Sequence, residues 1–226
     1  MNEANNAAAS GPEDKSRDGR FLIPRQQMVD EQLRARGISD QRVLDAMLHV
    51  PRHEFIPERY REQAYEDHPL PIGEGQTISQ PYIVASMLEA LNLLPTEKVL
   101  EVGTGTGYVT ALLAEIAAQV FSIERHAALA DRARETIAKL GYRNVEIVVG
   151  DGSHGLPQHA PFDAIIVSAA AAQLPAGLVT QLCDGGRMII PVGGVEQQQL
   201  QLIRLKNGLP QISLREPCRF VPLIMD

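Results

Sequence analysis

The glycine-rich run EVGTGTGY at residues 101–108 constrains the fold of this chain more than any other segment. It overlaps a short apolar run, Lys98–Val102, that suits a buried strand, and it leads into an apolar, helix-prone stretch at 109–118. A strand, a glycine turn and a helix in succession bring backbone N–H groups close to a bound nucleotide. Glycine permits the left-handed backbone and the close ligand approach that such a turn needs. The plainer alternative is a tight turn that holds no ligand.

The spacing of the glycines indicates which cofactor the turn suits. The dinucleotide-binding pattern G-x-G-x-x-G requires a glycine at position 108, where this chain has Tyr108. The glycines instead stand at every second position, and Glu101 lies inside the preceding strand. This departure disfavours a nicotinamide-dependent dehydrogenase.

Two further apolar runs end in a carboxylate. The run VFSIE ends at Glu124, about 20 residues beyond the turn, where a ribose-binding acid is expected. A carboxylate can accept hydrogen bonds from both ribose hydroxyls. The run VEIVVGDG carries Asp151. Each acid taken alone could be a solvated loop residue, but three acids at successive β-like runs favour a shared ligand site.

The segments around the turn alternate between strand-like and helix-like patterns. Strand-like runs open at Val99, Val120, Val145 and Ala164. Such alternation predicts an α/β fold with a doubly wound, mostly parallel sheet that holds its ligand at the carboxyl ends of the strands. Helices are expected at 25–36, 40–48, 81–91, 109–118, 129–140 and after Pro175, and later strands at 187–192, 200–205 and 219–223.

Composition predicts one domain and a polar tail. The 226 residues are enough for a single sizeable α/β domain. Residues 1–22 are expected to form a flexible tail, and 23–226 a single domain. Within that domain we expect an N-terminal helical cap and substrate-binding lip at 23–95, a cofactor-binding core at 96–206 and a C-terminal strand segment at 207–226.

Charge and cysteine content narrow the functional class. The formal net charge is −7, which argues against a nucleic-acid-binding enzyme because such enzymes usually carry a basic face. The only two cysteines, Cys183 and Cys218, are distant in sequence and suit reduced thiols. We expect no transmembrane or signal segment, no metal site among the six histidines, and a cytoplasmic location.

The segment before the glycine turn indicates a family. Residues 65–81 read YEDHPLPIGEGQTISQP, and with the turn downstream this resembles the protein-L-isoaspartate O-methyltransferases. The turn itself is similar to motif I of the S-adenosylmethionine-dependent methyltransferases. GQTISQP is the most specific element, and Ser168 stands where the family pattern has threonine. The resemblance covers roughly residues 25–224 and includes HVPRHEFIP at 49–57, APFDAIIVSAAA at 160–171, IPVG at 190–193 and RFVPL at 219–223.

The resemblance implies a class I, Rossmann-like methyltransferase that repairs damaged proteins. Such an enzyme transfers a methyl group from S-adenosylmethionine to the free carboxylate of an L-isoaspartyl residue and releases S-adenosylhomocysteine. The methyl ester then converts through a succinimide towards normal aspartate. The implied partners are isoaspartyl proteins and peptides, without nucleic acid, membrane or metal, and the enzyme is expected to be a monomer.

The resemblance also implies roles for individual residues. Ser79 is expected to donate a hydrogen bond to the substrate carboxylate, although it could instead be the N-cap of the helix that follows. Asp151 and Gly152 are expected beside the adenine. Secondary substrate-binding candidates are Thr77, Gln80, Arg219, Val221 and Leu223, the last three from a segment that could instead be a plain edge strand. The implied cofactor-binding residues are Glu101, Gly103, Thr104, Gly105, Gly107, Glu124, Arg125, Asp151 and Gly152.

Two rival functions follow from the same residues. A methyltransferase acting on a small molecule or on RNA would share the fold, but the GQTISQP run and the acidic charge disfavour it. A cofactor-binding adaptor without catalysis would bind S-adenosylmethionine and turn over no isoaspartyl peptide. Ser79 disfavours the adaptor, which has no need of a donor at the substrate site.

Overall fold

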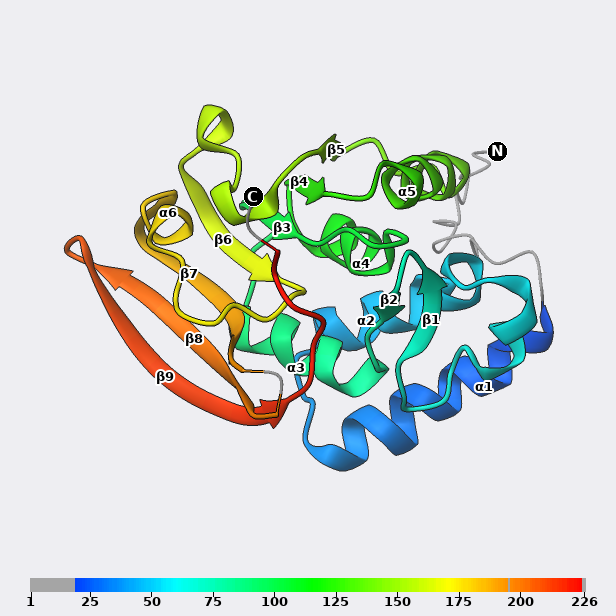
Figure 1. Cartoon of the computed structure of the whole chain (residues 1–226). Coiled ribbons are helices and arrows are strands. Elements are labelled where there is room, and N and C mark those ends of the chain that lie inside the picture. Colours follow the sequence, from blue (N-terminus) through cyan, green and yellow to red (C-terminus); the bar gives the residue numbers. More distant parts are fainter. Residues whose placement is uncertain (1–18, 195, 225–226) are drawn as a thin grey trace, which may run out of the picture.

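A seven-stranded sheet forms the centre of the computed structural model, which describes residues 19–194 and 196–224 (Figure 1). The strand order is β5-β4-β3-β6-β7-β8-β9, in which β3 to β7 run parallel and β8 and β9 are antiparallel. The order reverses between β3 and β6, and a ligand crevice is expected at such a switch point. The strands are β3 Lys98–Val102, β4 Gln119–Glu124, β5 Val145–Val149, β6 Phe162–Val167, β7 Leu182–Gly193, β8 Gln198–Lys206 and β9 Leu209–Cys218.

The central strands are apolar because helices or loops cover both faces of the sheet. Alternate residues of β3 enter two separate core clusters, with Val99 on one face and Leu100 on the other. The first cluster is the larger and includes residues of α4, α5 and the N-terminal helices. The core helices are α4 Tyr108–Ile116, α5 Ala127–Lys139 and the short α6 Ala176–Val179, which confirms the predicted alternation.

The N-terminal helices form a cap against the sheet. The first helical segment runs without a break through α1 Leu22–Gln27, η2 Met28–Leu33 and η3 Arg34–Arg36, and it ends at Gly37 with a left-handed φ of 96°. Helix α2, Gln41–His49, is capped by the Asp40 side chain, which accepts a hydrogen bond from the Arg42 backbone. Helix α3 spans Pro81–Leu91 as predicted. Short 3₁₀ turns and a β1–β2 hairpin (Leu70–Gly73 and Gln76–Ile78) connect α2 to α3.

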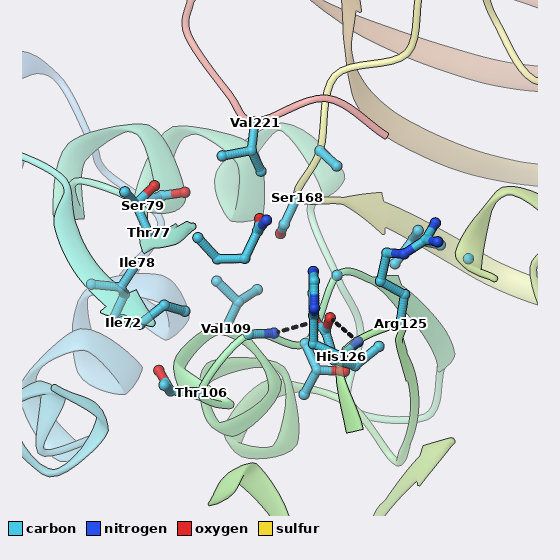
Figure 2. A pocket seen from close by; sticks show the side chains of 18 of the residues that line it. Ile72, Thr77, Ile78, Ser79, Thr106, Val109, Arg125, His126, Ser168 and Val221 are labelled. Carbon is cyan, nitrogen blue, oxygen red and sulfur yellow. Dashed lines mark hydrogen bonds between the residues drawn. The ribbon is translucent and has the colours of Figure 1, made fainter. Parts of the chain in front are cut away.

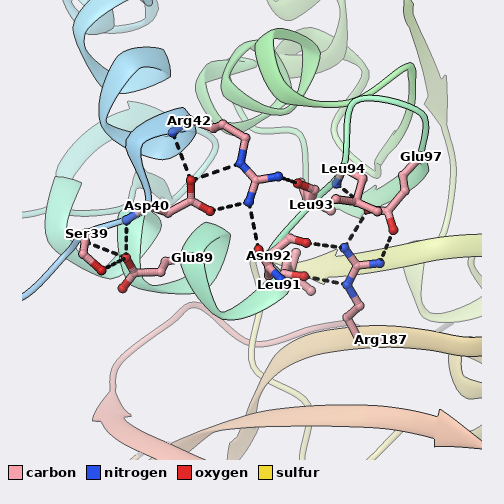
Figure 3. Close-up of polar contacts among 10 residues, drawn as sticks. All are labelled: Ser39, Asp40, Arg42, Glu89, Leu91, Asn92, Leu93, Leu94, Glu97 and Arg187. Atoms are coloured by element: carbon pink, nitrogen blue, oxygen red, sulfur yellow. Dashed lines mark hydrogen bonds and ion pairs between the residues drawn. The ribbon is translucent and has the colours of Figure 1, made fainter.

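A buried ion pair fastens the end of α3 to the sheet (Figure 3). Arg187 of β7 is only 7% exposed, and its guanidinium lies 2.6 Å from the Glu97 carboxylate. The same guanidinium donates hydrogen bonds to the carbonyls of Leu91 and Asn92, the last residues of α3 and its C-cap. This attachment ties the C-terminal end of α3, the end away from the β1–β2 hairpin, to the sheet.

Two expectations for the chain ends need correction. Most of the predicted tail lies outside the described residues, but residues 19–22, which we assigned to it, are helical. Phe21 is 2% exposed and stacks on the His53 ring at a centroid distance of 4.2 Å, so an apolar contact extends the folded part towards the N-terminus.

The predicted last strand at 219–223 is wrong. The last strand is instead β9, Leu209–Cys218, which follows a turn at Asn207-Gly208 in which both residues have positive φ. Its side chains are mostly exposed on both faces and it contains two prolines, so it lacks the apolar alternation of a half-buried strand. Residues 219–223 form no strand, and their backbone contacts include an isolated bridge between Ala170 and Pro222 and two hydrogen bonds between Phe220 and the Gln198 side chain of β8.

Among the described residues, no helix is long and apolar enough to cross a membrane. The same part of the chain contains no group of three or more histidine, cysteine or acidic side chains that could hold a metal ion.

Candidate active site

The main pocket lies at the carboxyl ends of β3, β4 and β6, where the strand order reverses. Figure 2 shows Ser79 and Thr77 on one side, Arg125 and His126 across from them, and Val221 above. Its empty volume, with the open mouth included, is about 830 Å³, within the range of small-molecule sites. The β1–β2 hairpin and the segment up to Ser79, which we call the lip, form one wall.

The glycine turn forms the floor, and its backbone requires glycine. Gly103, Gly105 and Gly107 all have positive φ, at 93°, 55° and 93°. A side chain on Gly105 would also press against Ile72 of the lip, 3.2 Å from its Cδ1. The absence of side chains therefore lets the lip and a ligand approach the turn closely.

Glu124 joins the glycine turn to the next loop. The carboxylate accepts a hydrogen bond from the Gly105 backbone N–H and another from that of His126, both at 2.9 Å. It is 6% exposed and lines the pocket. A carboxylate has about four acceptor positions, so two remain for the hydroxyls of a ribose.

Glu101 lies behind the turn and does not line the pocket. It is fully buried, and one of its oxygens accepts hydrogen bonds from Thr110 at 2.5 Å and Ser122 at 2.6 Å. Burial raises the pKa of Glu101 to about 8, and the nearby Glu124 charge adds to the rise. The carboxyl is therefore mainly protonated at neutral pH, and its role is to hold β3 and α4 behind the turn.

Glu101→Gln should remove a pH dependence of folding stability. In the folded chain the carboxyl keeps its proton up to about pH 8, whereas in the unfolded chain it loses it near 4.5. Unfolding therefore releases a proton between these values, and the wild type loses up to about 1.4 kcal/mol of stability per pH unit as pH rises through this window. Denaturant unfolding of both proteins between these pH values measures the effect. The free energy of unfolding of Glu101→Gln should increase relative to that of the wild type as pH rises. A difference that stays constant with pH would contradict a protonated Glu101.

The lip brings Thr77 and Ser79 to the pocket. The alternative role of Ser79 as N-cap is wrong, because Gln80 occupies the N-cap position of α3 and makes no side-chain cap bond. Among the described residues, the Ser79 hydroxyl has no hydrogen-bond partner. Gln80 does not line the pocket, and Gln76 does. The hydroxyl of Ser79 is therefore available to a ligand.

The remaining predicted residues divide into two groups. Thr104, Arg125, Gly152, Val221 and Leu223 line the pocket, while Gly107, Asp151 and Arg219 do not. Gly107 faces Ala133 of α5, and Asp151 accepts a hydrogen bond from the Ser153 backbone at 2.8 Å. Two hydrogen bonds of 2.7 Å between Ala170 and the backbone of residues 221 and 223 hold the C-terminal segment beside the pocket.

Several pocket residues escaped sequence reasoning, among them Ile72, Gln76, Thr106, His126 and Ser168. Two of them present buried polar atoms that have no hydrogen-bond partner among the described residues, Thr106 Oγ1 and His126 Nε2. Thr106 could have been found as a polar residue inside the turn, His126 as the second residue after Glu124 and Gln76 as a member of GQTISQP, but Ile72 carries no such signal. Together with Glu124 and the side-chain-free turn, these polar atoms fit a nucleoside-type cofactor.

Comparisons with known proteins agree on one family. The family model described as Protein-L-isoaspartate(D-aspartate) O-methyltransferase (PCMT) matches residues 24–226. A protein-L-isoaspartate O-methyltransferase of Koribacter versatilis is 57% identical over 90% of this chain and 92% of its own length. One from Methanoculleus marisnigri is 54% identical over 88% and 91%. A solved Plasmodium falciparum structure, titled a putative protein-L-isoaspartate O-methyltransferase in complex with S-adenosyl-L-homocysteine, is 30% identical with a TM-score of 0.78 and covers 88% of this chain and 98% of that one.

Proposed function

Because the chain belongs to the protein-L-isoaspartate O-methyltransferase family, we propose that its pocket holds S-adenosylmethionine on the glycine turn and the substrate carboxylate beside Ser79. The enzyme methylates isoaspartyl residues of proteins for repair, with S-adenosylmethionine as methyl donor and S-adenosylhomocysteine as product. One observation carries the assignment of the site: the free hydroxyl of Ser79 and the glycine turn line the same pocket.

The cofactor half of the site consists of the turn and the loops after β4 and β5. Glu124 would accept hydrogen bonds from the ribose hydroxyls, and Gly103 to Gly105 would meet the amino-acid part of the cofactor. Gly152 would lie against the adenine. Its place in the pocket lining supports this, and the position has no room for a side chain because a Cβ would lie 2.6 Å from Val102 Cγ1.

The substrate half consists of the lip and the C-terminal segment. Ser79 would donate a hydrogen bond to the isoaspartyl α-carboxylate, with Thr77 beside it. Val221 and Leu223, which are half-buried at the pocket, would contact the substrate peptide. Arg219 is exposed and lies outside the pocket lining, so we assign it no direct contact with the reacting group.

The reaction depends on alignment of the two reactants by the protein more than on proton transfer. An α-carboxylate has a pKa of roughly 3.3–3.7 and is already ionised at neutral pH, so it needs no general base. When bound, S-adenosylmethionine supplies an electrophilic methyl group. The lip and turn would hold the carboxylate oxygen in line with that methyl, and such alignment supplies roughly 7–11 kcal/mol. The resulting ester cyclises to a succinimide without help from these residues.

Methyl transfer to a matched pair of peptides tests the proposed function. The two peptides differ only in having aspartate or isoaspartate at one position, and labelled S-adenosylmethionine is the donor. We expect base-labile label on the isoaspartyl peptide alone. Label on neither peptide, with cofactor binding intact by calorimetry, would contradict the assignment and favour a non-catalytic adaptor or another acceptor.

We also propose that the enzyme acts as a monomer in a reducing compartment such as the cytoplasm. The two side chains that we assign to the cofactor and the substrate, Glu124 and Ser79, line the same pocket, and this supports a monomer. Both cysteines are free thiols, which suits a reducing environment. Sedimentation of the active enzyme at assay concentration would report its oligomeric state.

A further inference from the structure

Arg52 lies buried beneath the lip and contacts both halves of the site. It opens the 3₁₀ turn η4, Arg52–Phe55, and is 0% exposed. Its Nη2 donates a hydrogen bond of 2.8 Å to the Ser79 carbonyl, and its Nε one of 2.7 Å to the Ala64 carbonyl. The guanidinium carbon lies 4.8 Å from the ring centroid of Tyr108, the first residue after the glycine turn.

Arg52 makes no direct ion pair with any described residue. In the described part of the chain, no carboxylate forms an ion pair with it, and its contacts are carbonyl oxygens and an aromatic ring. The charge of Asp67 favours the Arg52 cation from nearby, but the Asp67 carboxylate is engaged by Arg36 and by the backbone N–H of Tyr82 and makes no direct contact with Arg52. Burial lowers the pKa of Arg52, but arginine titrates so high that it stays protonated. A buried, unpaired cation is costly to keep, so an anion that arrives with a ligand would offset part of that cost.

The position of Arg52 indicates that its charge would favour binding of the substrate carboxylate. Its guanidinium holds the backbone of the residue whose hydroxyl faces the pocket, so it lies just behind the point at which the substrate carboxylate would bind. By contrast, Arg125 lines the pocket on the opposite, cofactor side. Two unit charges several ångströms apart at a protein site interact strongly enough to change binding about tenfold.

We propose that Arg52 is the positioning residue of the substrate subsite: it fixes the Ser79 backbone, and its charge makes the subsite prefer a carboxylate to an uncharged group. The preference has a consequence for turnover, because methylation neutralises the carboxylate and the ester product is held less tightly than the substrate. This inference rests on the proposed role of Ser79.

Binding of a charged and an uncharged peptide separates this charge role from a merely structural one. The probes are an isoaspartyl peptide and the same peptide with an α-carboxamide in place of the α-carboxylate. Both are titrated by calorimetry into the full chain saturated with S-adenosylhomocysteine. We expect the wild type to bind the carboxylate peptide more tightly than the carboxamide peptide. Arg52→Met should reduce the ratio of the two affinities about tenfold. A structural defect alone would weaken both peptides equally and leave the ratio unchanged.

Two further variants make the test independent of folding defects. Arg52→Lys keeps the charge but loses the two-pronged contact with Ser79 and Ala64, so we expect it to retain the ratio within about threefold while kcat falls. Arg187→Met removes a buried arginine far from the pocket and should lower Tm without changing the ratio. If Arg52→Met does not fold, the result from Arg52→Lys decides. An Arg52→Lys variant that no longer prefers the carboxylate peptide to the carboxamide peptide would overturn the proposal. A variant that keeps this preference with a reduced kcat would support it.

The wild type distinguishes failure of this inference from failure of the site assignment. A wild-type enzyme without preference for the carboxylate would contradict the substrate subsite at Ser79 itself. A wild-type preference that survives in a folded Arg52→Met would overturn only the role of Arg52.

Discussion

Glu124→Ala should raise the Kd for S-adenosylhomocysteine by about 100- to 1000-fold. The carboxylate accepts two backbone hydrogen bonds that join the glycine turn to the loop after β4, and we assign it the ribose hydroxyls as well. A hydrogen bond to a charged group contributes about 1.5–3 kcal/mol, and losing two near the lower end of this range, about 3–4 kcal/mol together, accounts for the expected increase. Calorimetric titration of the product into wild type and variant measures the change.

The matched control is Glu135→Ala, because Glu135 is an exposed glutamate on α5 that does not line the pocket. It should bind the product as the wild type does. A Kd of Glu124→Ala within about threefold of the wild type would mean that the cofactor does not use this carboxylate.

Ser79→Ala should lower kcat/KM for an isoaspartyl peptide by roughly ten- to hundredfold. The hydroxyl lines the pocket without a partner in the described structure, and we assign it one hydrogen bond to an anion, worth about 1.5–3 kcal/mol. Steady-state methyl transfer at saturating S-adenosylmethionine measures the loss. The Kd for S-adenosylhomocysteine should stay unchanged, because Ser79 belongs to the lip and we assign it no contact with the cofactor.

Ser213→Ala, on the exposed strand β9, is the matched control and should keep full activity. Two results would contradict the role of Ser79 as a donor. An unchanged kcat/KM would mean that the hydroxyl is not used. A loss of about a millionfold would instead indicate a covalent nucleophile, which is the scale seen when one is removed.

The central fold was predictable because its signals are local. Buried parallel strands need continuous apolar runs, and Lys98–Val102 and Gln119–Glu124 show them at the predicted places. Gly37, Asp40 and Pro81 end, cap and begin helices by backbone rules that act within a few residues. Strand β9 was missed because it pairs with β8 at the sheet edge without burying a face.

The site was predictable in outline, and its details depend on tertiary structure. The glycine turn, Glu124 and the lip were found because each is one continuous motif. Sequence reasoning could not tell that Glu101 faces away from the pocket, because that depends on which side of β3 meets α4. It likewise gave no role to Arg52, whose importance arises from contact with Ser79, 27 residues along the chain.

A crystal structure of the enzyme with S-adenosylhomocysteine and an isoaspartyl peptide would test the central claim most directly. The claim is that one pocket holds the cofactor on the turn and the substrate carboxylate on the lip. We expect the ribose hydroxyls on Glu124 and the peptide α-carboxylate within hydrogen-bond distance of the Ser79 hydroxyl, facing the cofactor sulfur. A carboxylate bound away from the lip, or a cofactor bound away from the glycine turn, would contradict it.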